Sequence, residues 1–86
     1  MENLKYFSEM ERFEIININD GEKYNFLGNN DIIIDEEGNF KYIILFNGRS
    51  RLSLFSKPES KEIPWDCVKK IGTKTVIIDV SGEQLR

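Results

Sequence analysis

The stretch KEIPWDCVKKIGTKTVIIDV, residues 61–80, decides the fold, because it joins a strand breaker, the only tryptophan and an alternating apolar run. Strict alternation predicts a β-strand over 75–80. Its buried face is expected to hold Val76, Ile78 and Val80. Pro64 ends a brief strand before it, since proline cannot donate a backbone hydrogen bond to a sheet. Trp65 is then expected to fold over one end of a small β domain, while DCVKKI makes one turn into the last hairpin.

The single cysteine in this stretch, Cys67, offers a competing interpretation as a reactive nucleophile. A cysteine nucleophile needs a neighbouring base, and the chain contains no histidine, so Lys69 or Lys70 could assist only electrostatically. A cysteine also behaves as a small apolar side chain that packs well in a core. We therefore interpret this stretch as a structural corner. The residues with predicted structural roles are Pro64, Trp65 and Gly72.

Turn residues divide the rest of the chain into short apolar segments, a pattern that indicates a small all-β sandwich or barrel. The predicted strands, about six besides the brief one that Pro64 ends, lie at 13–19, 23–29, 31–38, 40–46, 49–56 and 75–80. The segment 40–46 is apolar on both faces, which fits a central strand or a subunit interface. In the second strand, Tyr24, Phe26 and Gly28 are expected on one side. The predicted fold class is an all-β, small antiparallel β-barrel.

A short helical turn is expected only near the N-terminus, over residues 4–13. Ser8 is its predicted N-cap, because Glu11 follows three residues later as in a capping box. This turn is expected to close one end of the barrel.

The composition limits both the architecture and the chemistry. Eighty-six residues make one domain over 1–86 with its core at about 7–80, and 40% apolar residues are enough to fill it. One cysteine and no histidine exclude an intrachain disulfide, a cysteine-only metal site and histidine-based catalysis. The acidic residues Asp31, Asp35, Glu36 and Glu37 lack the spacing of a calcium loop. We expect no metal, no cofactor and no catalytic residue, so the protein is predicted not to be an enzyme.

The chain also lacks the sequence signals of membrane insertion. No apolar run approaches the length of a membrane span, and the acidic start lacks the basic and apolar regions of a signal peptide. We expect a cytoplasmic protein.

Charge is unevenly spread along the chain, whose net charge is −3. Residues 1–37 carry ten acids and three bases, whereas residues 38–86 carry nine bases and five acids. Within the second half, the segment 49–61 interleaves basic and aromatic side chains. The candidate partner-binding residues are Arg49, Arg51, Phe55, Lys57 and Lys61. A protein partner is the first interpretation, and RNA is the weaker one, because the net charge is negative and one aromatic residue is involved.

Four stretches make the chain similar to the PRC-barrel superfamily, and within it to the small YlmC/YmxH type. They are FSEMERFEIININDGEKYNFLGN, DIIIDEEGNFKYIIL, RLSLFSKPESKEIPWDCVKKIG and TVIIDV. The I-P-W, K-I-G and closing-strand block is the most specific of them. Met10 and Arg12-Phe13 depart from the usual Leu and Gly-Lys of the family, and its glycine- and phenylalanine-rich loop keeps only Phe55 here.

The resemblance implies a small β-barrel whose interior is filled by side chains. It also implies an adaptor or assembly role, because one relative sits in the photosynthetic reaction centre and another forms half of the ribosome-maturation factor RimM. The type resembled is associated with sporulation. The resulting hypothesis is a non-catalytic module that binds an unknown protein partner. The alternative is an RNA- or ribosome-assembly adaptor using the basic loop 49–61. The thin core and the two-faced segment 40–46 also motivate a homodimer.

Overall fold

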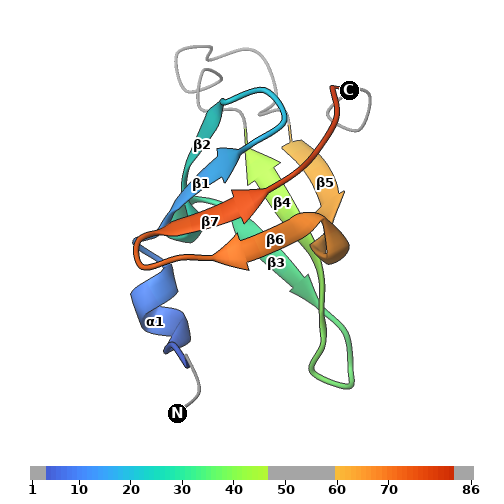
Figure 1. Cartoon of the computed structure of the whole chain (residues 1–86). Helices are drawn as coiled ribbons and strands as arrows, with labels where there is room; N and C mark the ends of the chain where they lie inside the picture. Colours follow the sequence, from blue (N-terminus) through green and yellow to red (C-terminus); the bar gives the residue numbers. More distant parts are fainter. Residues whose placement is uncertain (1–3, 47–59, 83–86) are drawn as a thin grey trace, which may run out of the picture.

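The computed structural model describes residues 4–46 and 60–82, and within them one α-helix and seven short strands enclose a single core (Figure 1). The α-helix α1 spans Phe7–Met10. The strands are β1 (Glu14–Asn17), β2 (Lys23–Phe26), β3 (Asp31–Ile34), β4 (Phe40–Phe46), β5 (Ser60–Pro64), β6 (Val68–Ile71) and β7 (Thr75–Ile78). Two single 3-10 turns complete the described elements, η1 (Leu27–Asn29) and η3 (Trp65–Cys67).

The strands pair into two sheets, one with the order β2-β1-β7-β6 and the other with the order β3-β4-β5. β1 runs parallel to β7, with Ile15 beside Val76, while the remaining pairs are antiparallel. The expected all-β fold is confirmed, but the expectation of wholly antiparallel pairing is wrong, because β1 and β7 pair in parallel. Within the described ranges the two sheets do not join into a closed barrel. A tight turn forces antiparallel pairing only on consecutive strands. Because β1 and β7 are separated by most of the chain, no hairpin sets their relative direction.

Each 3-10 turn is a corner where the chain passes from one sheet to the other. At η1, the amide of Leu27 donates to the Phe13 carbonyl at 2.8 Å, and the amide of Gly28 donates to the Glu11 carbonyl at 2.9 Å. These bonds tie the corner to the segment between α1 and β1. The second corner, η3, follows Pro64 directly and leads into β6.

The side chain of Asn30 joins the two sheets beside the first corner. Its Nδ2 donates to the carbonyls of Tyr24 and Phe26 in β2, both at 2.9 Å. Its Oδ1 accepts from the amide of Phe46 at the end of β4, also at 2.9 Å. One amide group therefore satisfies backbone groups of both sheets, which would otherwise be left without partners where the ladders end.

The core lies between the two sheets and, among the described residues, is apolar except for one side chain. Its buried apolar members are Met10, Phe13, Ile15, Leu27, Ile43, Leu45, Ile63, Val76, Ile78 and Val80. The buried polar residue is Asn17, whose Nδ2 donates to the Val80 carbonyl at 2.9 Å and whose Oδ1 accepts from the Val80 amide at 3.0 Å. The side chain thus extends the β1–β7 pairing beyond Ile78, where β7 ends.

Several strand predictions are confirmed. β4 has the predicted bounds and is the central strand of its sheet, with Ile43 and Leu45 buried. The three alternating residues of 75–80 are all buried, as expected. The predicted strand over 49–56 lies outside the described residues.

Three local predictions are wrong. Ser8 is not the helix cap, because α1 begins one residue before it and Tyr6 occupies that position. The second strand ends before η1, and this turn directs Leu27 into the core while Phe26 stays exposed. The segment 66–71, predicted as one turn into the last hairpin, includes a strand, β6, which pairs with β7. β6 was missed because its two adjacent lysines interrupt the apolar and polar alternation that indicates a strand.

Candidate interaction surface

The corner formed by Pro64 and Trp65 packs against the core at the end of β5. Trp65 is half-buried, and its ring meets the Phe40 ring edge-on, with centroids 4.8 Å apart and planes at 81°. Phe40 in turn contacts Phe7 of α1, with ring centroids 6.3 Å apart. Edge-to-face aromatic pairs at these distances are favourable beyond the area that they bury. The arrangement fits a structural role for Trp65, which links the corner to β4 and, through Phe40, to α1.

Cys67 is half-buried at the end of this corner, and its backbone carbonyl accepts a hydrogen bond from the Asp79 amide at 2.9 Å. The bond fastens η3 to the chain just after β7. Because the chain has no histidine, the base that a cysteine nucleophile needs would have to come from another residue type. The geometry of Cys67 therefore supports its interpretation as part of the corner.

Gly72 closes the turn between β6 and β7. Its amide donates to the Thr75 carbonyl at 2.8 Å. A Cβ atom at this position would lie 2.8 Å from Thr75 Oγ1, closer than real Cβ contacts. The tight turn leaves no room for a side chain unless Thr75 moves, which agrees with a structural role for this glycine.

The basic partner-binding candidates are not brought together by the described structure. Arg49, Arg51, Phe55 and Lys57 lie outside the described residues. Lys61 lies in β5, half-buried and opposite Leu45 of β4. The proposal of a basic binding loop therefore stays a prediction from the sequence.

The acidic residues after β3 form a turn. Asp35 Oδ1 accepts hydrogen bonds from the amides of Glu37 and Asn39, both at 2.9 Å. These hydrogen bonds favour the ionised carboxylate and so hold the pKa of Asp35 below its ordinary value, and the bond from the Asn39 amide has the larger effect. Within 4–46 and 60–82, no three acidic or cysteine side chains gather closely enough to hold a metal ion.

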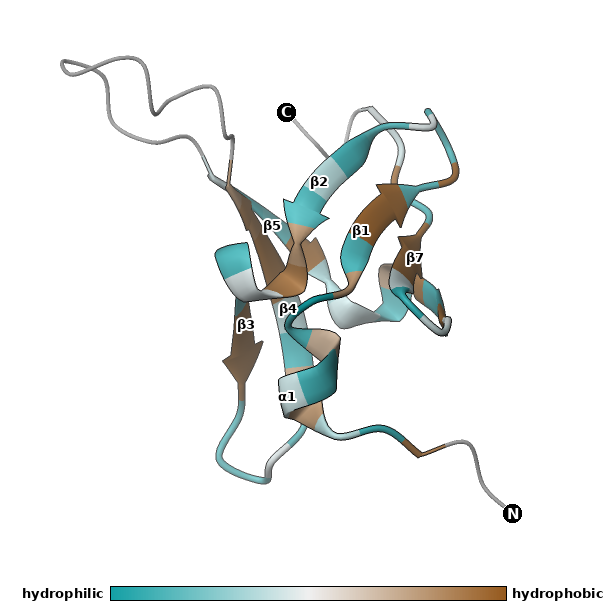
Figure 2. Ribbon diagram, turned by 90° about the vertical axis from the view of Figure 1, so that its left-hand side faces the viewer, coloured by the Kyte–Doolittle hydropathy of each residue, from teal (hydrophilic) through white to brown (hydrophobic). Residues whose placement is uncertain are grey.

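The three-stranded sheet presents an apolar face away from the core. Ile43 of β4 points inward, and the alternate residues Tyr42 and Ile44 are only half-buried on the opposite side. Ile33 of β3 and Phe46 of β4 are 41% and 40% exposed. Figure 2 shows β3 and the upper part of β4 coloured as apolar at one side of the molecule. The two-faced pattern of 40–46 was the sequence signal for this surface.

A second feature is an open hollow between α1 and η1. It has a volume of about 650 Å³ and is lined by Ser8, Glu11, Arg12, Phe26, Gly28 and Asn29. The lining side chains are exposed, so the hollow offers no enclosed, dry site of the kind that small ligands usually occupy.

The fold consists of two short sheets that enclose one filled core and are joined at 3-10 corners. This fold agrees with the one implied by the family that the sequence resembles. The chain belongs to the PRC-barrel domain family, which matches residues 2–85. It is similar to the Bacillus subtilis (strain 168) protein named "Probable sporulation protein YlmC", at 31% identity over 74 residues. The match covers 86% of this chain and 90% of that protein. No solved structure is significantly similar to the chain. Across 4–46 and 60–82, no helix has the length and apolar character needed to cross a bilayer.

Proposed function

We propose that this PRC-barrel chain is a non-catalytic adaptor that binds a protein partner through the outer face of the β3-β4-β5 sheet. The observation that carries the proposal is the apolar character of that face, where Ile33 and Phe46 stay about two-fifths exposed. Contiguous exposed apolar surface on a small domain commonly marks an interaction site. A chain of 86 residues has little further surface to bury in its own core.

The similarity to a protein named for sporulation supports a role in the same process. We place the protein in the cytoplasm of a spore-forming cell, where it would act by assembly and not by catalysis. Counting heat-resistant spores after deletion of its gene in the native host tests this part. If the deletion strain forms a normal number of spores, and the tagged protein still captures a partner in the undeleted host, sporulation is removed from the proposal and the adaptor role is left.

The adaptor role is tested by affinity capture of the tagged protein from a cross-linked lysate of its host, with and without nuclease. We expect a protein partner that survives nuclease treatment. A Phe46→Lys bait, which places a charge on the apolar face, should lose that partner. Ile18→Lys is the matched control, because Ile18 is 56% exposed in the turn that follows β1, away from the three-stranded sheet. Capture that disappears with nuclease would instead support the RNA alternative.

A homodimer through the same face remains a separate prediction. Sedimentation at high micromolar concentration distinguishes a monomer from a dimer. If the wild type is a dimer and Phe46→Lys is a monomer, the second copy binds at this face. A wild-type protein that stays monomeric would contradict the homodimer and leave the adaptor proposal intact.

A further inference from the structure

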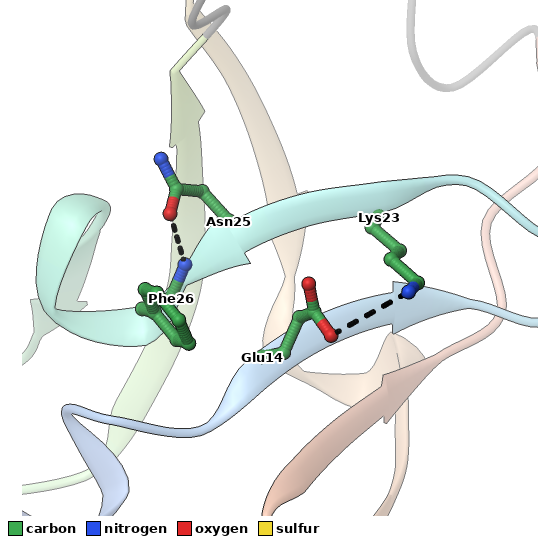
Figure 3. Close-up of polar contacts among 4 residues, drawn as sticks. All are labelled: Glu14, Lys23, Asn25 and Phe26. Atoms are coloured by element: carbon green, nitrogen blue, oxygen red, sulfur yellow. Dashed lines mark hydrogen bonds and ion pairs between the residues drawn. The ribbon is translucent and has the colours of Figure 1, made fainter.

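Four edge strands bound the two sheets in the described part of the chain, and two of them are distorted. β2 and β6 each carry one residue more than the strand that they pair with. In β2 the distortion includes Asn25, whose φ of 67° is left-handed and whose Oδ1 accepts from the Phe26 amide at 2.8 Å. Figure 3 shows this bond and the Lys23–Glu14 ion pair beside it, 3.9 Å between charged atoms. Bulges and lysines are devices that keep an edge strand from pairing with another chain.

The third edge, β5, carries equivalent protection. Pro64 has no amide to offer to an added strand, and Lys61 places a charge on the strand. Both residue types are typical of edges that do not accept another strand. β6 adds the exposed pair Lys69 and Lys70 to its bulge.

β3 lacks these devices. Its sequence is Asp31 followed by three isoleucines, with neither proline nor lysine. Ile33 and Ile34 are 41% and 52% exposed. The register with β4 is irregular near Ile33, but the extra residue lies in β4, at Lys41, so β3 itself alternates regularly. In Figure 2, β3 lies at the side of the molecule with β4 on one flank.

Both ends of β3 carry acidic residues, which favour a basic partner at this edge. Asp31 begins the strand, and the exposed Glu36 and Glu37 follow it after Asp35; Lys41 nearby offsets only part of this charge. A second copy pairing antiparallel about Ile33 would set Asp31 beside the Asp35 end of its partner. Parallel pairing would set Asp31 beside its own counterpart. Like charges placed directly opposite destabilise a strand pair, so these two pairings of a second β3 are disfavoured.

We propose that the edge of β3 is the docking site for an extended segment of the partner protein, in which basic residues flank a short apolar run. This inference rests on the proposed adaptor function and names the surface and the chemistry of its partner. Strand addition supplies backbone hydrogen bonds for affinity and alternate side-chain contacts for specificity. The added strand would place every second side chain beside Ile33, extending the apolar outer face of the sheet.

Asp31 has a specific part in this docking. Its Oδ1 accepts a hydrogen bond from the amide of Ile32 at 2.8 Å. In the absence of a partner, this bond satisfies a backbone group of the edge strand. An incoming carbonyl would replace the carboxylate at that amide, and the released carboxylate would pair with a basic side chain of the partner.

The test measures binding of a synthetic peptide, Arg-Lys-Val-Thr-Ile-Thr-Val-Lys-Arg, to the full chain by amide NMR titration. We expect shifts confined to β3 and the outer face, and binding that weakens as salt is added. Ile33→Lys should weaken binding on the order of tenfold or more, because it sets a like charge against the peptide. Ile18→Lys again serves as the matched exposed control and should bind as the wild type does.

Two control peptides separate charge from strand addition. Replacing every basic residue by Glu should abolish binding, and replacing the central Ile by Pro should weaken it by removing a ladder donor. Equal binding of the Glu peptide, shifts at another edge, or no binding of the basic peptide would overturn the inference. A wild-type dimer that Ile33→Lys converts to a monomer would also overturn it, by assigning the edge to a second copy. If the Ile33→Lys bait captures the same nuclease-resistant partner as wild type while the Phe46→Lys bait loses it, the edge is excluded and the adaptor function stands.

Discussion

At the scale of single residues, Asn17 is the polar side chain on which the core depends. Its amide reproduces a backbone pair with Val80, inside an otherwise apolar cluster. Removing it in Asn17→Ala leaves a buried amide and a buried carbonyl of Val80 without partners, at a cost of about 1–3 kcal/mol. Asn17→Asp should cost more, since it sets a buried carboxylate against the Val80 carbonyl. Urea unfolding measures both variants.

The control for Asn17 is its exposed neighbour Asn19. The Asn19 side chain donates to Asp79 Oδ1 at 3.3 Å on the surface. Asn19→Ala should change the free energy of unfolding by no more than about 0.5 kcal/mol. If both alanine variants unfold at the same urea concentration, the hydrogen bonds between Asn17 and Val80 do not add to the free energy of unfolding, and this explanation of the core is wrong.

Asp35 gives the protein a pH dependence whose sign follows from its hydrogen bonds. The amides of Asn39 and Glu37 lower the pKa of Asp35 in the folded state below its ordinary 3.8. A depressed carboxyl pKa contributes stability that is present above the unfolded value and lost as pH falls through the folded value. The wild type should therefore lose its advantage over Asp35→Asn, which keeps an acceptor oxygen, only in acid below 3.8.

Carbon-detected NMR titration of the Asp35 carboxyl checks this directly. A midpoint at or above the ordinary value would show that the turn amides do not favour the carboxylate. The same titration in Asn39→Pro, which removes the amide that lowers the pKa of Asp35 most, should move the midpoint upward.

At the scale of elements, the first corner depends on Gly28. A Cβ at this position would lie 2.9 Å from the Glu11 carbonyl oxygen, a backbone atom that cannot rotate away. Gly28→Ala should destabilise the protein by about 1–3 kcal/mol through this overlap. Gly82→Ala is the matched control, because a Cβ there meets nothing within 4 Å. Thermal unfolding followed by circular dichroism compares the two, and equal melting temperatures would contradict the close approach.

The second corner is reported by Trp65. Because its ring is half-buried against Phe40, native fluorescence should be blue-shifted and should move to the red on unfolding. Phe40→Ala should shift the native emission part of the way to the red, by opening one side of the indole to water. A native spectrum that resembles free indole would contradict the packing of this corner.

The elements that alternation predicts well are those whose two faces have different environments. The last strand was found because burial on one face imposes a period of two, whereas β4 was found as a short apolar run bounded by turn residues, since both of its faces are apolar. β6 escaped prediction because Lys69 and Lys70 are adjacent and the strand carries a bulge, so its pattern has no such period. The parallel β1–β7 pair has no local signal, since pairing between distant strands depends on the whole fold.

The candidate site was predictable only in part for a similar reason. Alternation in 40–46 indicated an apolar second face, which the exposure of Phe46 bears out. The open edge at β3 depends on strand order and on the bulge lying in β4, and neither can be read from a local pattern. The sequence instead directed attention to the basic residues of 49–61, of which Lys61 alone lies in the described structure.

At the scale of the whole molecule, the two sheets should unfold together. Ile43 and Ile63 of the three-stranded sheet share one core with Val76 and Ile78 of the other. Removing methylenes in Ile63→Ala should cost about 2–5 kcal/mol, a large part of the total stability of a domain this small. Because the cavity faces both sheets, amide signals of β1 and β7 should lose intensity at the same lowered urea concentration as those of β4. A variant in which only the β4 signals shift would show that the sheets are separate folding units, and that the shared core does not couple them.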